Sequence, residues 1–538
     1  MRPILEVARS LELSGDDLLL NGPYLAKLAW PTAERLRNQA VRGKLVLVSA
    51  MTPTKYGEGK TTTSIGLTQG LVARGHRAMA ALREPSLGPI FGAKGGGTGG
   101  GRASLEPAAK INMHCTGDLH AITSANNLLA ALADNALHFQ APAPLKTISW
   151  KRCLDLNDRF LRNTVIGLGG SAHGTPREDG FDITAASEVM AVLCLADGLE
   201  DLKKRLGRLI VGTDSSGKQI TAGDLEAVGA MAALLSEAIL PNLAQTNDGA
   251  PAFVHGGPFA NIAHGCNSIA ATRSALGLAD IVCTEAGFAF DLGGEKFLDL
   301  KCRQAGIWPS CVVLVVTVRA LRFHGGDTAG LGTIEKGFEN VARHLQAIRH
   351  TFGLPAIVAI NVFGDDKPEE LELIEKLSQT EGAACARNTG FLEGSAGSLA
   401  LADLVAHTVK GPVPTAKYSY PLEASAEEKI RAIATKVYGA RDIELTRDAR
   451  TQLAKAVKDG YGLLPVCMAK THLSLSDDVT AQGAPVDFTL TVREIRVRAG
   501  AGFLLALTGE ILTMPGLPRV PAAHHLDLAP DGTVTGLT

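Results

Sequence analysis

Short runs of aliphatic and β-branched residues alternate along this chain with longer segments of helical periodicity. The run Val312-Val-Leu-Val-Val-Thr-Val318 is far shorter than the roughly 20 residues that cross a bilayer, so it predicts a buried strand. Strands that alternate with helices favour an α/β fold, with a mostly parallel sheet covered by helices on both faces. The pattern predicts strands at 45–48, 78–82, 164–168, 279–284, 312–318 and 356–361, and helices at 60–74, 122–139, 185–195, 225–240, 332–352 and 424–438.

Composition excludes several classes of function. The 538 residues carry a net charge of −2 and only 5% aromatic residues, which argues against nucleic acid or an anionic membrane as main partner. The nine cysteines are scattered and form no C-x-x-C pair, which is typical of reduced thiols rather than disulfides or a zinc site. The N-terminus has no signal-peptide core. We therefore expect a cytoplasmic protein.

The most informative motif is T-P-T-K-Y-G-E-G-K-T-T-T at 52–63. It matches the phosphate-loop pattern G-x-x-x-x-G-K-[ST] except at Thr54, where the pattern has glycine. A predicted strand precedes the loop and a predicted helix follows it, as such a loop requires. Gly57 and Gly59 can offer backbone N–H groups to phosphate oxygens, Lys60 can reach a terminal phosphate, and the Thr61 hydroxyl can bind Mg²⁺. A helix-capping turn without a ligand is the alternative interpretation.

A second cation is predicted at the same edge of the sheet. A right-handed crossover returns the strand at 78–82 parallel to the strand at 45–48, so Arg83 should lie beside the phosphate loop. Arg83 can bind a phosphate or carboxylate through two N–H groups, although a surface ion pair would also explain it. Two cations facing one anion favour phosphoryl transfer. Glu285, near the end of another predicted strand, is either an acid that assists Mg²⁺ or a solvated loop residue.

Many longer motifs occur beyond the phosphate loop. They are R-E-P-S-L-G-P-I-F-G at 83–92, K-G-G-G-T-G-G-G at 94–101, I-N-M-H-C-T-G-D-L-H-A-I at 111–122, R-E-D-G-F-D-I-T-A-A-S-E at 177–188, F-V-H-G-G-P-F-A-N-I-A-H-G-C-N-S at 253–268, L-P-V-C-M-A-K-T at 464–471 and M-P-G-L-P at 514–518. Together with the phosphate loop, these motifs resemble the formate–tetrahydrofolate ligases, also called formyltetrahydrofolate synthetases. The resemblance runs through nearly the whole chain.

The resemblance implies a reaction and its ligands. The family joins formate to tetrahydrofolate at the expense of ATP, through formyl phosphate, and yields 10-formyltetrahydrofolate, ADP and phosphate. It implies Mg²⁺, activation by a monovalent cation (K⁺ or NH₄⁺) and a homotetramer. Lys60 and Arg83 would be catalytic, and Thr61 would bind the metal. The nucleotide would contact Thr54, Lys55, Tyr56, Gly57, Glu58, Gly59, Lys60 and Thr61, and the other substrates Arg83, Glu84, Asp118, Phe363 and Phe391.

The family also holds a flat ring system between two aromatic side chains. One matches Phe363; the other is usually the tryptophan of a W-A-x-G-G-x-G-G-like segment, which here reads G-F-L-E-G-S-A-G at 390–397. Phe391 thus replaces the tryptophan, and the second glycine of each pair is altered or displaced. The smaller ring costs of order 1 kcal/mol in stacking. The alternative is that both phenylalanines belong to the core.

The histidines near these motifs give no metal-binding pattern. His114, Asp118 and His120 have a weak H-x-x-x-D-x-H spacing, and structural roles explain them at least as well. His255 and His264 are nine residues apart in a glycine-rich loop and lack the helical spacing of zinc ligands. We expect them to be loop or pocket residues.

The predicted fold class is thus a phosphate-loop NTPase-like α/β sheet with additional smaller α/β domains. Residues 1–340 form the nucleotide-binding domain, with an inserted unit at about 105–235, and 341–538 contribute the aromatic pocket. Two other functions fit the loop alone. One is an ATPase switch of the partitioning or assembly type, and the other is a degenerate, non-catalytic binder of folate or nucleotide.

Overall fold

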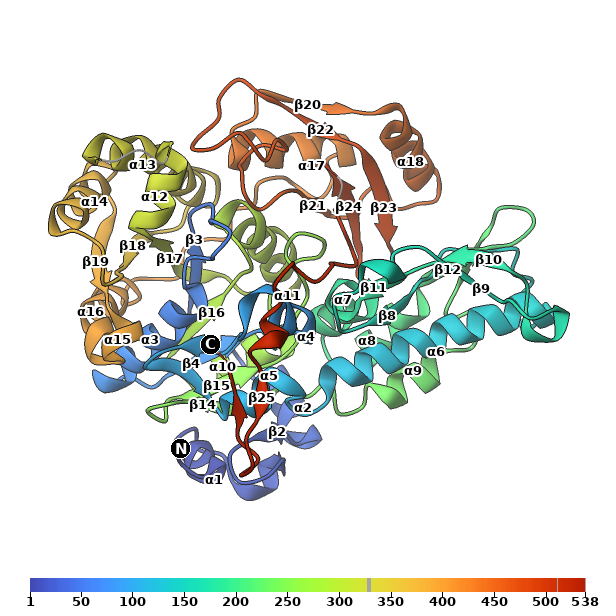
Figure 1. Ribbon diagram of the computed structural model, residues 1–538, viewed down its shortest axis with the longest axis horizontal. Coiled ribbons are helices and arrows are strands. Elements are labelled where there is room, and N and C mark those ends of the chain that lie inside the picture. The colour runs from blue at the N-terminus through green and yellow to red at the C-terminus, as the bar shows by residue number, and fades with distance from the viewer. Residues whose placement is uncertain (327–329, 510, 538) are drawn as a thin grey trace.

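The computed structural model describes residues 1–326, 330–509 and 511–537, and a large twisted sheet forms its centre (Figure 1). Seven neighbouring strands of this sheet are parallel. In spatial order they are β15 (Pro251–Val254), β4 (Ala78–Leu82), β16 (Ile281–Glu285), β3 (Lys44–Ala50), β17 (Pro309–Val316), β18 (Ala356–Asn361) and β19 (Ala384–Asn388). Antiparallel strands β14 (Asn242–Thr246), β2 (Ala26–Leu28) and β1 (Leu18–Leu20) extend the edge beside β15.

Helices cover both faces of this sheet, which explains why the strands β4, β17 and β18 are buried along their whole length. In β3, Val46 and Val48 pack in one cluster with Leu67 and Leu71 of α3 and with residues of α16. The alternate residue Leu47 belongs to a second cluster with α10 and α13. These helices are α3 (Lys60–Ala73), α16 (Leu399–Thr408), α10 (Ile269–Leu278) and α13 (Leu331–Gln346). The predicted α/β class with a mostly parallel, doubly covered sheet is confirmed.

The predicted inserted unit lies between β6 (Ala103–Glu106) and β14. Its long helix α6 (Asp118–Phe139) and the hairpin of β9 (Thr164–Ile166) and β10 (Arg177–Asp179) extend to one side of the molecule (Figure 1). The other helices of this unit are α7 (Glu188–Leu195), α8 (Leu199–Gly207) and α9 (Val228–Leu234).

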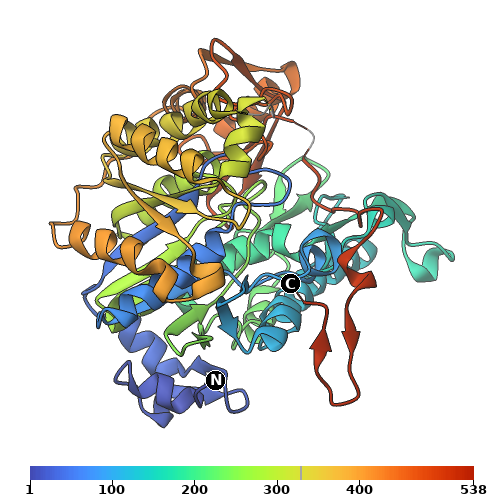
Figure 2. The ribbon, with the colours of Figure 1, turned by 60° about the vertical axis from the view of Figure 1, so that its left-hand side comes forward.

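The C-terminal third adds smaller sheets and helices. One sheet has the order β21 (Val466–Ala469), β24 (Phe503–Leu507) and β23 (Glu494–Arg498), and another pairs β20 (Asp442–Leu445) with β22 (Thr489–Val492). Helices α17 (Ala426–Ile433) and α18 (Arg447–Lys458) accompany them, and a short hairpin of β25 (Asp527–Leu528) and β26 (Val534–Thr535) projects near the C-terminus (Figure 2). Strands β18 and β19 follow residue 340 in sequence but belong to the central sheet, so the domain boundaries stay predictions.

The secondary structure differs from expectation at two places. The predicted strand at 164–168 is β9, which pairs only with β10 and stays outside the central sheet. The predicted helix at 225–240 is too long, because α9 starts only after Glu226, whose φ of 54° is not helical. Turns replace the helix after Leu234, with Ser236 N–H donating to the Ala233 carbonyl at 3.3 Å and Leu240 N–H to the Glu237 carbonyl at 3.0 Å. The strands at 78–82 and 356–361 have the predicted bounds, and the other predicted elements are present with shifted ends.

All nine cysteines carry free thiols, and only Cys385 is not fully buried. This agrees with the prediction of reduced thiols; the cytoplasmic location itself stays a prediction. Among the described residues, no helix is both long and apolar enough to cross a membrane.

Close packing of α3 on α16 gives a stability test. A Cβ at Gly70 would lie 2.9 Å from the Ser398 carbonyl oxygen and 3.2 Å from Ala402 Cβ. We expect Gly70→Ala to lower the thermal midpoint, because overpacking costs roughly 1–3 kcal/mol. The matched control is Gly229→Ala in α9, where no described atom beyond the local backbone lies within 4 Å of the added Cβ. Its midpoint should stay unchanged or rise, since alanine is the better helix former; equal losses in both variants would contradict the packing argument.

Candidate active site

The predicted phosphate loop joins β3 to α3, and two of its glycines are required by backbone geometry. Gly57 and Gly59 have φ values of 78° and 75°, in the left-handed region that favours glycine. A Cβ at Gly59 would also lie 2.4 Å from Asn361 Nδ2. Thr54 keeps a negative φ, and its carbonyl accepts from Gly57 N–H at 3.2 Å. The position where the pattern has glycine therefore accommodates threonine without backbone strain.

Glu58 acts as an internal brace of this loop. Its side chain is 1% exposed, and its carboxylate accepts from the Thr54 N–H at 2.6 Å and from the Thr317 hydroxyl. Its carbonyl accepts from Asn361 Nδ2 at 3.2 Å. The Glu58 carboxylate, which is predicted to contact the nucleotide, thus points into the protein. Lys55 and Tyr56, by contrast, are exposed at the tip of the loop.

The strand order brings the other predicted groups to the loop. Strand β16 lies between β3 and β4, so Glu285 at its end sits between Thr61 and Arg83. The Thr61 hydroxyl donates to Glu285 Oε2 at 2.8 Å, and Arg83 Nη2 lies 3.5 Å from Glu285 Oε1. Glu285 is 4% exposed in its side chain, so the alternative of a solvated loop acid is wrong.

The electrostatics of this edge favour an anionic ligand. Burial lowers the pKa of Lys60 to about 8; Glu285 opposes this shift, whereas the cations Lys94 and Arg83 add to it. Lys94 reaches the surface, but desolvation of its ammonium group by the surrounding protein still lowers its pKa, with Arg83 contributing and Glu285 opposing. Lys60, Lys94 and Arg83 thus lie close enough for their charges to repel one another, and a bound anion would reduce this repulsion.

Sequence reasoning missed two residues of this group. Lys94 opens the K-G-G-G-T-G-G-G motif, which was a usable signal because it follows the Arg83 segment closely. His472 comes from the C-terminal third, directly after the A-K-T of 469–471. Its ring stacks on Phe288 with centroids 4.3 Å apart, and burial, aided by Lys470, Lys94 and Lys60, lowers its pKa to about 4. His472 is thus neutral at pH 7.

Glu84, which follows Arg83 in sequence, and Asp118 form a separate buried cluster. Asp118 is 2% exposed and pairs with Lys27 Nζ at 2.7 Å and with Asn242 Nδ2 at 2.8 Å. Burial and the neighbouring Asp118 raise the pKa of Glu84 well above its usual range. These two predicted substrate residues lie together, and Arg83 links them in sequence to the cationic site.

The histidines do not form a metal site. His114 and His120 are exposed whereas Asp118 is buried. His255 is buried, with Nδ1 at 2.6 Å from the Ser268 hydroxyl and Nε2 at 2.6 Å from the Ala238 carbonyl. Within the described ranges, no group of three or more His, Cys, Asp or Glu side chains has metal-binding geometry.

The two predicted aromatic residues lie at the carboxyl ends of neighbouring strands. Phe363 follows β18 and is 37% exposed; Phe391 follows β19 and is 49% exposed. The backbone joins them, since Val362 N–H donates to the Asn388 carbonyl at 3.1 Å. Phe391 covers Gly100, where an added Cβ would lie 3.0 Å from its ring. Neither ring belongs to the core, so the core interpretation is wrong.

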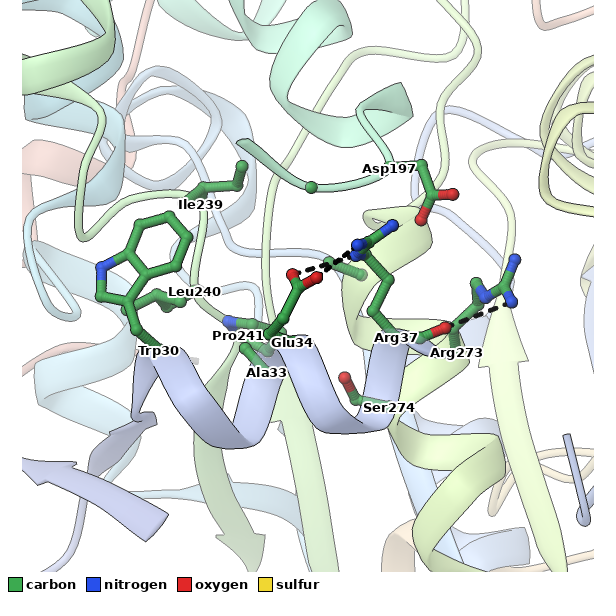
Figure 3. A pocket seen from close by; sticks show the side chains of 12 residues that line it. Trp30, Ala33, Glu34, Arg37, Asp197, Ile239, Leu240, Pro241, Arg273 and Ser274 are labelled. Carbon is green, nitrogen blue, oxygen red and sulfur yellow. Dashed lines mark hydrogen bonds and ion pairs between the residues drawn. The ribbon is translucent and has the colours of Figure 1, made fainter. Parts of the chain in front are cut away.

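A small pocket lies elsewhere, between α2 (Trp30–Asn38), α10 and the segment that precedes β14 (Figure 3). Trp30, Ile239 and Leu240 supply apolar surface, and Arg37 pairs with Glu34. None of the predicted site residues lines this pocket, so it has no part in the candidate site.

Comparison with known proteins identifies the family. A family model described as formate–tetrahydrofolate ligase matches residues 1–538. The chain belongs to the formate–tetrahydrofolate ligase family. A ligase of this name from Myxococcus xanthus is 54% identical over 548 residues, which cover 100% of this chain and 99% of the relative. The ligases from Symbiobacterium thermophilum and Nocardioides are 52% and 50% identical, each with 100% of this chain and 98% of the relative covered. These matches give no support to an ATPase switch.

The shifted pKa of Lys60 leads to a pH test. Pyrophosphate binding, measured by calorimetry, should weaken about tenfold or more between pH 7 and 9.5, because Lys60 loses its proton near pH 8. Glu285→Gln removes the charge that raises this pKa, so the decline should move to lower pH. Glu372→Gln, at an exposed position of α14 (Pro368–Thr380), is the control and should leave the profile unchanged. A decline that moves to higher pH in Glu285→Gln would contradict this assignment.

Proposed function

We propose that this protein ligates formate to tetrahydrofolate with consumption of ATP, giving 10-formyltetrahydrofolate, ADP and phosphate. The observation that carries the proposal is the meeting of Thr61 and Arg83 at Glu285 on the carboxyl edge of the parallel sheet, with Lys60 and Lys94 near enough for their charges to interact with Glu285. Relatives that bear the name of this ligase match the chain over nearly their whole length. Family and site therefore support the same activity.

The nucleotide would lie on the loop between β3 and α3, in a phosphate-loop NTPase-like arrangement. The left-handed Gly57 and Gly59 and the N-terminus of α3, which begins at Lys60, favour phosphate there. The residues also fit Mg²⁺, which prefers oxygen ligands: the Thr61 hydroxyl and the Glu285 carboxylate lie 2.8 Å apart. Bound there, Mg²⁺ would neutralise phosphate charge.

The first step would transfer the γ-phosphoryl group to formate. A formate oxygen attacks the γ-phosphorus, the bond to the bridging oxygen of ADP breaks, and formyl phosphate forms. Lys60 would stabilise charge on the transferring group, and Arg83 and Lys94 would hold formate and then the acyl phosphate. The Glu285 carboxylate, 3.5 Å from Arg83, would orient that guanidinium.

The second step would pass the formyl group to N10 of tetrahydrofolate. The amine attacks the formyl carbon, the bond from that carbon to the phosphate oxygen breaks, and the amine loses its proton. Phe363 and Phe391, both half-exposed at the same sheet edge, would hold the flat ring. Glu84 and Asp118 would bind substrate beside Arg83. The monovalent cation and the homotetramer stay predictions from the family resemblance.

An omission assay tests the proposed function. Formation of 10-formyltetrahydrofolate should require ATP, formate and tetrahydrofolate together, and Lys60→Ala should lower the rate by about a thousandfold while the thermal midpoint is kept. The control is Lys376→Ala at an exposed position of α14. Full-rate ATP hydrolysis without formate and folate, or normal activity in Lys60→Ala, would refute the proposal, and an absence of formyl transfer would favour the non-catalytic binder.

The aromatic pair gives a second test. We expect Phe391→Trp to lower the KM for tetrahydrofolate by up to about tenfold, because the larger ring offers more stacking area. Phe160→Trp is the control, since Phe160 is 84% exposed on the projecting unit. An unchanged or higher KM in Phe391→Trp would argue against a pocket-facing Phe391.

A further inference from the structure

Arg319 touches two parts of the candidate site at once. It lies in the first turn of α12 (Val318–Gly325), directly after β17. Its Nη2 donates to the carbonyl of Gly57 at 2.8 Å, so this side chain holds the backbone of the phosphate loop. None of the sequence motifs predicted a role for Arg319.

The same guanidinium lies between two aromatic rings. Its central carbon is 5.3 Å from the centroid of Tyr56, in the phosphate loop, and 5.1 Å from the centroid of Phe363, at the ring pocket. Both distances fall within the range of cation–π attraction. Arginine suits this place because its planar group can stack and donate a hydrogen bond together, whereas lysine offers a point charge.

Further hydrogen bonds tie the same elements together. Thr317, two residues before Arg319, bonds to the Glu58 carboxylate. Asn361, two residues before Phe363, donates to the Glu58 carbonyl. The segments that carry Arg319 and Phe363 are therefore both hydrogen-bonded to Glu58, the residue next to Gly57.

The exposure of the rings separates this arrangement from ordinary core packing. Tyr56 is 69% exposed and Phe363 is 37% exposed, so both rings reach solvent; Lys55 Nζ also lies 4.9 Å from the Tyr56 centroid. The Arg319 Nε is buried and has no hydrogen-bond partner among the described residues. In the position that contacts both rings, the Arg319 side chain thus leaves its Nε–H group without a hydrogen bond to the described residues.

We propose that Arg319 is a positioning residue that couples the ring pocket to the phosphate loop, so that tetrahydrofolate and ATP each strengthen the binding of the other. The inference rests on the proposed function, in which Phe363 binds the folate ring. A ring stacked on the open face of Phe363 restricts that side chain, which fixes Arg319 and, through Gly57, the loop that receives the phosphates. Such coupling is reciprocal by thermodynamic necessity.

Calorimetry without formate measures this coupling, since no turnover occurs. The dissociation constant of a non-hydrolysable ATP analogue is determined with and without saturating tetrahydrofolate. In the unaltered protein we expect the analogue to bind about fivefold tighter or more with folate present. In Arg319→Met the ratio should fall to about one, and in Arg319→Lys, which keeps the charge but not the plane, it should be intermediate.

The structure also supplies a control variant for this experiment. Arg387→Met removes an exposed arginine of β19 whose partner is Glu375, and it should keep the full ratio. A ratio near one in the unaltered protein, or an undiminished ratio in Arg319→Met, would overturn the inference. Arg319→Lys decides the matter if Arg319→Met does not fold, because an undiminished ratio there also overturns it. The omission assay separates the two proposals: product formation with intact coupling in the variants defeats only the role of Arg319.

Discussion

The parallel alignment of β3, β16 and β4 is the constraint on which the rest of the site depends. These strands are neighbours in the sheet, and parallel strands end at a common edge, so Lys60, Glu285 and Arg83 meet although more than 200 residues separate the first from the second. Glu285 then links Thr61 to Arg83. An antiparallel partner in place of β16 would send this carboxylate to the opposite end of the strand and leave the cations without it.

The two carboxylates nearest the cations of the site have different roles. Glu58 points inward and braces the phosphate loop against Thr317, whereas Glu285 faces the cations. Glu285 and Glu58 both raise the pKa of Lys60, whereas burial and the nearby Lys94 and Arg83 lower it. The proposed phosphate ligand would add negative charge where these cations repel one another.

Sequence reasoning succeeded where a local pattern carries its own geometry. The strands at 78–82 and 356–361 have the predicted bounds, and α3 starts at Lys60 as the loop motif requires. It failed where backbone conformation outweighs composition: the apolar stretch at 225–240 is helical only over Val228–Leu234, because Glu226 takes a positive φ before it. His472 was missed because no local pattern distinguishes a pocket residue from an ordinary loop residue, whereas Lys94 opens a glycine-rich motif that could have indicated it.

By itself, the sequence determined the α/β class, the glycine-rich strand–loop–helix unit at 52–63, the placement of Lys60 and Arg83 at one sheet edge, and the family, because these follow from periodicity, from a right-handed crossover and from contiguous motifs. Only the tertiary structure decided which way each side chain faces. It turned Glu58 inward and Glu285 toward the cations, left Phe363 and Phe391 half-exposed, and placed Arg319 between Tyr56 and Phe363. The direction in which a side chain points depends on strand order and on packing between residues far apart in the chain, and no local pattern encodes these.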